Sequence, residues 1–280
     1  MFKVKPMRPK DYIFATDLAN TMDWNMAPED FQFMTSLEPE GSFVLFDGLK
    51  QVGIATCISY GKVGWFGNLI VKDETRKKGA GSMLVKHAVD YLRGKGVETV
   101  GLYAYPNLVR FYGNLGFQYD ADFSVLHADS LGVVSSEALP IVDAKNIGQI
   151  EKFDRTCFGG DRKKLLESII LQKDNLSYCV SKGNEVAGYV AATVYETMAW
   201  VGPLVCQERN VDVAASLVKA VIAKLAGLTV YVALQKTEST IISDLLYSMG
   251  FKEDFSVARM YLGHSAAKNC IYLAESLERG

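Results

Sequence analysis

The spacing of apolar side chains predicts short strands that alternate with amphipathic helices. Over residues 81–95, apolar side chains recur every three or four positions, which is the spacing of one helix face. Two apolar runs at 42–46 and 51–60 flank a glycine-containing turn and predict a β-hairpin. The same criteria predict further strands at 2–7, 65–71, 97–104 and 123–127, helices at 11–19 and 107–114, and a helical or loop-like stretch at 23–37.

This pattern occurs twice along the chain. When the sequence is shifted by 135 residues, 47–55 falls on 182–190 and 65–71 falls on 200–206 without a gap. The coinciding residues include Gly48 with Gly183, Gly53 with Gly188, Trp65 with Trp200, and Gly67 with Gly202. The coincidence indicates a tandem repeat of one α/β (α+β) unit, a central mixed sheet flanked by helices. We place the domains at 1–130 and 131–280, because residues 128–139 carry no periodic apolar face.

Composition and charge narrow the class of protein. The chain has 280 residues, of which 49% are hydrophobic and 22% charged, which is a normal globular mixture. A net charge of -2 argues against a protein that mainly binds nucleic acid or an anionic membrane, since both tasks need excess Lys and Arg. No apolar run reaches the roughly 18 residues of a membrane-spanning helix, and the first residues lack the apolar core of a secretion signal.

The cysteines and histidines form no metal-binding pattern. Five scattered cysteines without a Cys-x-x-Cys pair suit free thiols in a reducing cytoplasm, so we expect a cytoplasmic protein without disulfides. The three histidines lie far apart in the sequence, and we expect no metal site. Cys57 has no neighbouring His or Asp to activate it, which favours a buried structural thiol over an acyl-cysteine nucleophile.

The segment from 69 to 84 carries the clearest chemical signal. A predicted strand leads into a polar turn, and the pattern Arg76-x-x-Gly79-x-Gly81 then opens a helix. Glycines allow backbone N–H groups to approach an anion closely, and a helix N-terminus adds partial positive charge. The turn lacks the Gly-Lys-Ser/Thr ending of an NTPase loop and the three-glycine dinucleotide spacing. It therefore predicts a diphosphate site, although a glycine-rich turn before a helix explains the pattern alone equally well.

A second motif follows the next predicted strand, where Asn107 precedes Phe111-Tyr112 and the helix end Gly116-Phe117. With this motif, residues 51–117 resemble the GNAT superfamily of acetyl-CoA-dependent N-acetyltransferases. In that family a strand, the Arg/Gln-x-x-Gly-x-Gly/Ala turn, a helix, a strand and an Asn…Phe-Tyr-x-x-x-Gly-Phe segment follow in this order. The resemblance implies two tandem GNAT domains with a divergent second copy, each a mixed, mostly antiparallel sheet.

The resemblance also implies a cofactor site for acetyl-CoA. The strand before the turn would splay from its neighbour and pair with the pantetheine arm through Leu69, Ile70 and Val71. Asn107 matches the family residue that touches the cofactor. The pyrophosphate would lie on the backbone N–H groups of the turn, which Arg76 leads: Lys77, Gly79, Ala80, Gly81 and Ser82.

The implied reaction is direct attack of an amine on the thioester within a ternary complex. Tyr112 matches the family tyrosine near the thioester sulfur, where it would protonate the leaving thiolate; the alternative is a packed aromatic beside Phe111. Many family members place a glutamate on the strand before the turn. This chain has Asn68 there and Glu74 in the turn beyond, so we assign no general base.

The acceptor would bind near the predicted loop between the first two helices. Asp23 and Trp24 in this loop suit a small cation through charge and cation–π contact, or else they form a capped helix entry with one packed tryptophan. We expect a small primary amine, such as an amino acid or a polyamine. The alternatives are a protein or peptide N-acetyltransferase, and a regulatory module that binds acetyl-CoA without turnover.

The second copy has lost the glycine-rich turn. Residues 207–215 contain no glycine and place Glu208 and Asp212 where phosphate would lie. Leu246 stands where the first copy has Tyr112. We therefore expect that this half does not bind acetyl-CoA, and that it completes the acceptor pocket or packs as an intramolecular pseudo-dimer. The oligomeric state is not determined by the sequence.

Overall fold

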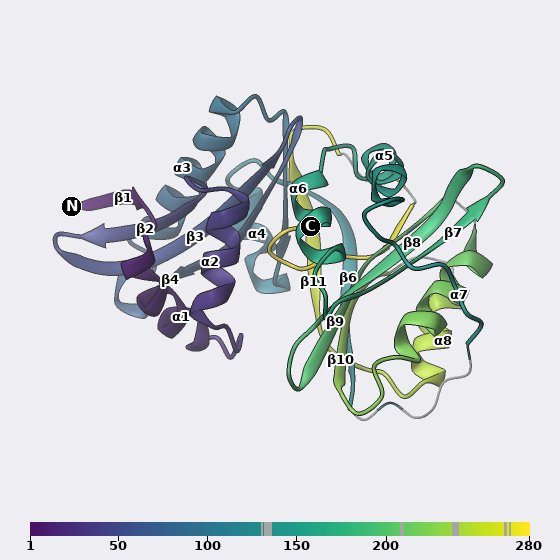
Figure 1. The fold of residues 1–280 in the computed structure, drawn as a ribbon. Coiled ribbons are helices and arrows are strands. Elements are labelled where there is room, and N and C mark those ends of the chain that lie inside the picture. Colours follow the sequence, from purple (N-terminus) through teal and green to yellow (C-terminus); the bar gives the residue numbers. More distant parts are fainter. Residues whose placement is uncertain (130, 132–135, 208–209, 237–240, 266–267, 269) are drawn as a thin grey trace.

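The structure is a computed structural model that describes residues 1–129, 131, 136–207, 210–236, 241–265, 268 and 270–280. The strands of this part form one continuous twelve-stranded sheet, and helices cover both faces (Figure 1). The elements of the first half are β1 (Phe2–Pro6), α1 (Tyr12–Asn20), α2 (Pro28–Leu37), β2 (Ser42–Asp47), β3 (Lys50–Tyr60), β4 (Val63–Val71), α3 (Ala80–Gly94), β5 (Thr99–Ala104), α4 (Val109–Gly113) and β6 (Gln118–Ala128).

The second half repeats this order from α1 onward, and its described strands include no counterpart of β1. Its elements are α5 (Ile147–Phe158), α6 (Lys163–Ile170), β7 (Leu176–Lys182), β8 (Glu185–Val194), β9 (Met198–Cys206), α7 (Val211–Ile222), β10 (Thr229–Gln235), α8 (Ile241–Ser248) and β11 (Lys252–Leu262), followed by the short β12 (Ile271–Leu273). The tandem repeat and the mixed, mostly antiparallel sheet are thereby confirmed. In the described residues, the parallel pairs are β4 with β5 and β9 with β10.

The sequence predictions agree with these bounds, with one clear exception. The closing strand of the first half was predicted over 123–127 but extends over Gln118–Ala128. Its first residues, which include Asp120 and Asp122, are polar and lack an apolar run. Pairing with β11 holds them in the strand, through Gln118 opposite Tyr261 and Tyr119 opposite Met260. This polar stretch adopts strand conformation because it pairs with a segment that is distant in the sequence.

The two halves exchange their last strands. The strand order is β1-β2-β3-β4-β5-β11-β6-β10-β12-β9-β8-β7, so β11 of the second half lies between β5 and β6 of the first half. Reciprocally, β6 of the first half lies between β11 and β10 of the second. The predicted boundary at residue 130 lies outside the described residues and stays a prediction. The sheet itself shows that each half is completed by a strand of the other.

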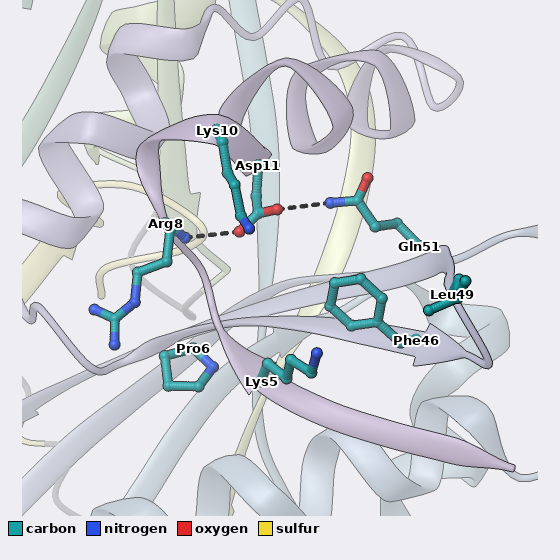
Figure 2. A pocket seen from close by; sticks show the side chains of 8 residues that line it. All are labelled: Lys5, Pro6, Arg8, Lys10, Asp11, Phe46, Leu49 and Gln51. Carbon is teal, nitrogen blue, oxygen red and sulfur yellow. Dashed lines mark hydrogen bonds between the residues drawn. The ribbon is translucent and has the colours of Figure 1, made fainter.

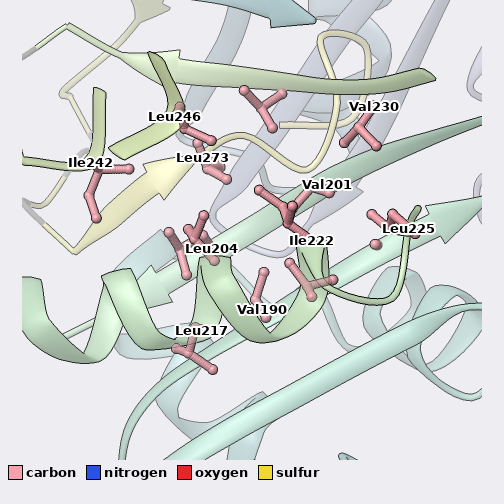
Figure 3. Close-up of a cluster of buried hydrophobic side chains, with 14 of the residues drawn as sticks. Val190, Val201, Leu204, Leu217, Ile222, Leu225, Val230, Ile242, Leu246 and Leu273 are labelled. Carbon is pink, nitrogen blue, oxygen red and sulfur yellow. The ribbon is translucent and has the colours of Figure 1, made fainter. Parts of the chain in front are cut away.

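The helices of the first half pack on opposite faces of its sheet. Adjacent residues of β3 point to opposite sides, and Ile54 packs with Ala15 and Leu18 of α1. Ala55 packs instead in the core that holds Leu84 of α3. The largest core belongs to the second half, where α7 and α8 cover β8, β9 and β10 (Figure 3). A further core joins α2 of the first half to α5 and α6 of the second, so the halves also share buried apolar surface.

Candidate active site

Strands β4 and β5 separate halfway along their length. They pair in parallel at Val63 with Thr99, Gly64 with Val100, and Trp65 with Gly101, and among the described residues the pairing ends there. β4 continues to Val71, still paired with β3 on its other side. Asn68 has a φ of +50°, and the β3–β4 register shifts between Ile54 and Thr56. This bulge turns the last residues of β4, Leu69, Ile70 and Val71, away from β5.

The turn that follows, residues 76–82, presents backbone donors to solvent. Lys77 and Gly79 have φ angles of +60° and +83°, and α3 begins directly afterwards. Met83 N–H donates to the Gly79 carbonyl, which closes the first helical turn. Five backbone N–H groups that precede Met83 have no hydrogen-bond partner among the described residues: Lys77, Gly79, Ala80, Gly81 and Ser82. These donors and the helix N-terminus fit an anion such as a pyrophosphate.

The predicted leading residue, Arg76, is exposed and forms an ion pair with Asp73 at 2.9 Å. Asp73 belongs to a short 3₁₀ turn, Asp73–Thr75, which connects β4 to the turn. A hollow of about 570 Å³ lies between this connection and α1, with Phe14 and Asp17 on its α1 side. Arg76 therefore stands beside a space large enough for part of a ligand.

Tyr112 lies on the α3 side of the sheet, next to the point where β4 and β5 separate. Its ring packs against Phe66, the first β4 residue beyond the paired stretch, with ring centroids 6.4 Å apart. It also meets Phe111 and Phe117 edge to face. Within the described part of the chain, its hydroxyl makes no hydrogen bond, and burial raises the pKa of Tyr112. A tyrosine in this state stays protonated and is a weaker acid than an exposed one.

Asn107 lies in the 3₁₀ turn Pro106–Leu108, just after β5 ends, and its side chain is exposed. The structure thus places Asn107 and Tyr112 on consecutive turns beyond the same strand. Cys57, by contrast, is buried in the sheet, and burial raises the pKa of its thiol. A buried protonated thiol is not an acyl-accepting nucleophile.

The two predicted acceptor residues have different environments. Asp23 is exposed, with a φ of +57°, in the loop between α1 and α2. Trp24 turns inward, and its Nε1 donates to the Tyr105 hydroxyl at 3.1 Å. Tyr105 in turn meets Phe255 of β11. The loop is therefore fixed against the end of β5 and against a strand of the second half.

Residues 274–280, which the sequence predictions did not include, also lie at this site. This segment crosses the side of β4 that faces α2, and a Cβ built on Gly67 would lie 2.6 Å from Glu278 Cα. Trp65 Nε1 donates to the Leu277 carbonyl at 3.4 Å. The repeat partners act alike: Trp200 Nε1 donates to the Ala274 carbonyl at 3.4 Å, and a Cβ on Gly202 would overlap that oxygen. The repeated Trp-x-Gly was the available signal, because both copies accommodate this one segment.

In the second half, the opening between β9 and β10 is filled by the chain itself. The parallel pairing ends at Tyr231 with Trp200, and β12 then lies between the two strands. Before α7, the Asn210 side chain accepts from Lys182 and donates to Gln207. Residues 208 and 209, which include the predicted acidic Glu208, lie outside the described residues. The second opening therefore has no room for a bound pantetheine.

Other surface features give no catalytic arrangement. A hollow of about 500 Å³ beside β1 is lined by three basic side chains, but Asp11 there already accepts from Arg8 N–H and from Gln51 (Figure 2). In the described part of the chain, no group of three or more His, Cys, Asp or Glu side chains could hold a metal ion. A search of the described helices finds none long and apolar enough to cross a membrane.

Two family models match the chain. The model described as Acetyltransferase (GNAT) family matches residues 12–117, and that described as Acetyltransferase (GNAT) domain matches residues 150–272. A curated relative, the holothin acyltransferase of Pseudoalteromonas sp. (strain SANK 73390), is 24% identical over 288 residues, which cover 99% of this chain and 94% of the relative.

Solved structures share the fold over the whole length. A Pyrococcus horikoshii protein assigned as an acetyltransferase has a TM-score of 0.83 at 19% identity, over 100% of this chain and 96% of that chain. A tandem GNAT protein from the clavulanic acid biosynthesis pathway has a TM-score of 0.62 at 13% identity, over 95% of this chain and 100% of that chain. The two-unit architecture therefore recurs in other proteins of this fold.

Proposed function

Because the chain belongs to the GNAT superfamily and is an acyltransferase with two tandem domains, we propose that its first half transfers an acetyl group from acetyl-CoA to a primary amine of a small molecule. One observation carries the proposal: the opening between β4 and β5 leads directly to the 76–82 turn, where five N–H groups have no partner among the described residues. The opening suits the pantetheine arm and the turn suits the pyrophosphate, as the resemblance implied.

The residues present fit this cofactor. The unpaired edge of Leu69, Ile70 and Val71 offers amide and carbonyl groups to the amides of the pantetheine arm. Asn107, exposed just beyond β5, would contact the arm from the other side. Arg76 would meet the phosphate groups, although its pairing with Asp73 reduces the charge that it offers. Backbone donors therefore supply most of the recognition.

In the proposed reaction, the amine nitrogen attacks the thioester carbonyl carbon, so that a C–N bond forms and the C–S bond breaks. The nitrogen loses one proton, which a base or a chain of water molecules must accept. An N–H group of the β4 edge would stabilise the oxyanion. Tyr112 would donate its hydroxyl proton to the departing thiolate and regain one from solvent. The hydroxyl stays protonated at neutral pH, as this role requires, while burial raises its pKa and makes it a weaker acid than an exposed tyrosine. Proton transfer of this kind contributes about 10²–10⁴-fold to a rate.

The acceptor would reach the thioester from the α2-facing side of β4. This side is enclosed, which supports a small acceptor rather than a protein chain. Segment 274–280 covers the α2-facing side of β4 at Gly67, and Trp24 fastens the α1–α2 loop to Tyr105. A folded protein could not bring its surface against β4 without displacing both. The second half thus contributes to the acceptor pocket, while β12 excludes a second cofactor from its own opening.

The proposal is tested by calorimetry with acetyl-CoA and by release of free thiol across a panel of free amines and peptides. We expect one acetyl-CoA per chain and turnover with free amines. Turnover with peptides alone would support a protein N-acetyltransferase, and binding without turnover would support a regulatory module. Two equivalents per chain, or none, would contradict the assignment of the site.

A further inference from the structure

Segment 274–280 is built into the molecule rather than laid on its surface. Arg279 forms an ion pair with Glu275, in which Nε and Nη2 both lie 3.0 Å from a carboxylate oxygen, and its guanidinium stacks over the Phe33 ring of α2. The Tyr60 hydroxyl of β3 donates to the Arg279 carbonyl at 3.0 Å. An oxygen of Gly280 accepts from the buried Arg162 of the second half. These contacts fix the backbone of the segment from both halves of the protein.

This fixed backbone places Glu278 against β4 at the position where β4 leaves β5. Gly67 lies two residues beyond the last β4–β5 pair, and a Cβ built there would lie 2.7 Å from the Glu278 Cβ and 2.9 Å from its carbonyl oxygen. Any other residue at 67 would therefore force the segment or β4 to shift. Gly67 is followed by Asn68, where many family members carry a glutamate and this chain carries an amide that donates to the Thr56 hydroxyl.

The Glu278 carboxyl group is partly enclosed but keeps access to solvent. Its side chain is 23% exposed, and its Oε1 accepts from Arg279 Nη1 at 2.5 Å. Burial raises the pKa of Glu278 against the opposing effect of Arg279, and nearby Glu275 and Asp30 raise it further. The titratable groups that face it come from the segment, from α2, from β3 and from the β8–β9 turn: Arg279, Glu275, Asp30, Tyr60 and Tyr195.

We propose that Glu278 is the proton acceptor of the reaction, a carboxylate brought to β4 from the end of the second half in place of one on the strand itself. This inference rests on the proposed function. As the amine nitrogen bonds to the thioester carbon, the proton lost by the nitrogen passes to the Glu278 carboxylate, and Tyr112 donates its hydroxyl proton to the departing sulfur. Glu278 then releases its proton to water, and Tyr112 recovers one.

The test uses the full-length protein with Glu278→Gln, Glu278→Asp and the matched control Glu185→Gln, an exposed glutamate at the first residue of β8. Acetyl-CoA affinity is measured by calorimetry, and thiol release is measured with water, L-lysine and spermidine as acceptors from pH 5 to 10. We expect Glu278→Gln to lower kcat about 100-fold at pH 7, with the acetyl-CoA affinity within about twofold of the unmodified protein. Glu278→Asp should recover part of the rate, and Glu185→Gln should match the unmodified protein.

Two further readouts separate a proton acceptor from a structural residue. The acid limb of the pH–rate profile should be lost in Glu278→Gln, since no carboxyl remains to titrate there. In protein labelled with ¹³C at the glutamate carboxyl groups, the signal missing from Glu278→Gln should titrate above the usual value of about 4.3 and move when acetyl-CoA is added.

Unchanged turnover in Glu278→Gln, or a Glu278 signal that ignores bound acetyl-CoA, would overturn the assignment while leaving the cofactor site intact. A rate that rises in Glu278→Gln would identify the segment as an obstruction instead. Failure of the unmodified protein to bind acetyl-CoA would remove the proposed function, and this inference with it, and calorimetry alone would reveal that outcome.

Discussion

Replacement of Arg162 by alanine should destabilise the protein strongly. The side chains of Arg162 and Asp154 are 0% and 1% exposed, and they form a two-point ion pair with Nη2 to Oδ1 at 2.6 Å and Nε to Oδ2 at 3.1 Å. The Tyr189 hydroxyl also donates to Asp154 Oδ1, at 2.6 Å. The substitution leaves a buried carboxylate without its counter-ion and releases Gly280, and breaking a buried pair costs about 3–5 kcal/mol.

For a chain of 280 residues, an unfolding entropy of about 2.1 cal/mol/K per residue converts this cost to a fall in Tm of about 5–9 °C. Calorimetric melting at pH 7 measures it. Arg155→Ala is the matched control, because Arg155 pairs with Asp161 at 2.6 Å on the surface, with side chains 56% and 45% exposed. Exposed pairs contribute about 0–1 kcal/mol, so its Tm should fall by less than about 2 °C. Equal shifts in the two variants would refute the reasoning.

Three further predictions concern the site and its support. Gly79→Val should weaken acetyl-CoA binding at least about tenfold by calorimetry, because φ is +83° there and the donors are adjacent; Gly48→Val, at φ +61° in a remote turn, should cost similar stability but leave binding unchanged. Tyr112→Phe should lower kcat about 10²-fold without changing acetyl-CoA affinity, and full activity in the variant would exclude the donor role. Because burial raises the pKa of Tyr112, the unmodified enzyme should keep its activity up to about pH 10. Burial raises the pKa of Glu38, but its hydrogen bonds, first that from Lys164, outweigh burial and lower the pKa to about 2. The Glu38 carboxylate should therefore stabilise the fold above about pH 4.5 and lose that contribution as the pH falls towards 2. Melting curves of Glu38→Gln at acid pH should lack this dependence.

The sequence pattern predicted those helices and strands whose determinants lie within the element itself. The helix at Ala80–Gly94 and the hairpin of β2 and β3 were evident from apolar spacing and a glycine turn. The 76–82 turn was also evident, because its glycines and the following helix are contiguous in the sequence. The residues predicted to bind the cofactor lie around one opening, and their roles stay predictions until a complex is measured.

Long-range pairing could not be predicted in this way. Nothing in residues 118–128 indicates that they pair with residues 252–262, since strand pairing depends on edges that distant segments provide. Glu275, Glu278 and Arg279 form a polar run that suggests exposure, yet Glu275 and Arg279 are buried because they neutralise each other. The sequence shows that a residue is charged, but it does not show which distant residue will neutralise that charge when both are buried.

The exchange of β6 and β11 has a consequence for biosynthesis. The sheet that carries the 76–82 turn needs β11 beside β5, and β11 begins only at Lys252. During translation, β5 must therefore wait with an open edge until more than a hundred further residues have left the ribosome. Such distant pairings form slowly, and a nascent chain with a bare strand edge is a natural client for chaperones. The half that is synthesised first is thus among the last to mature.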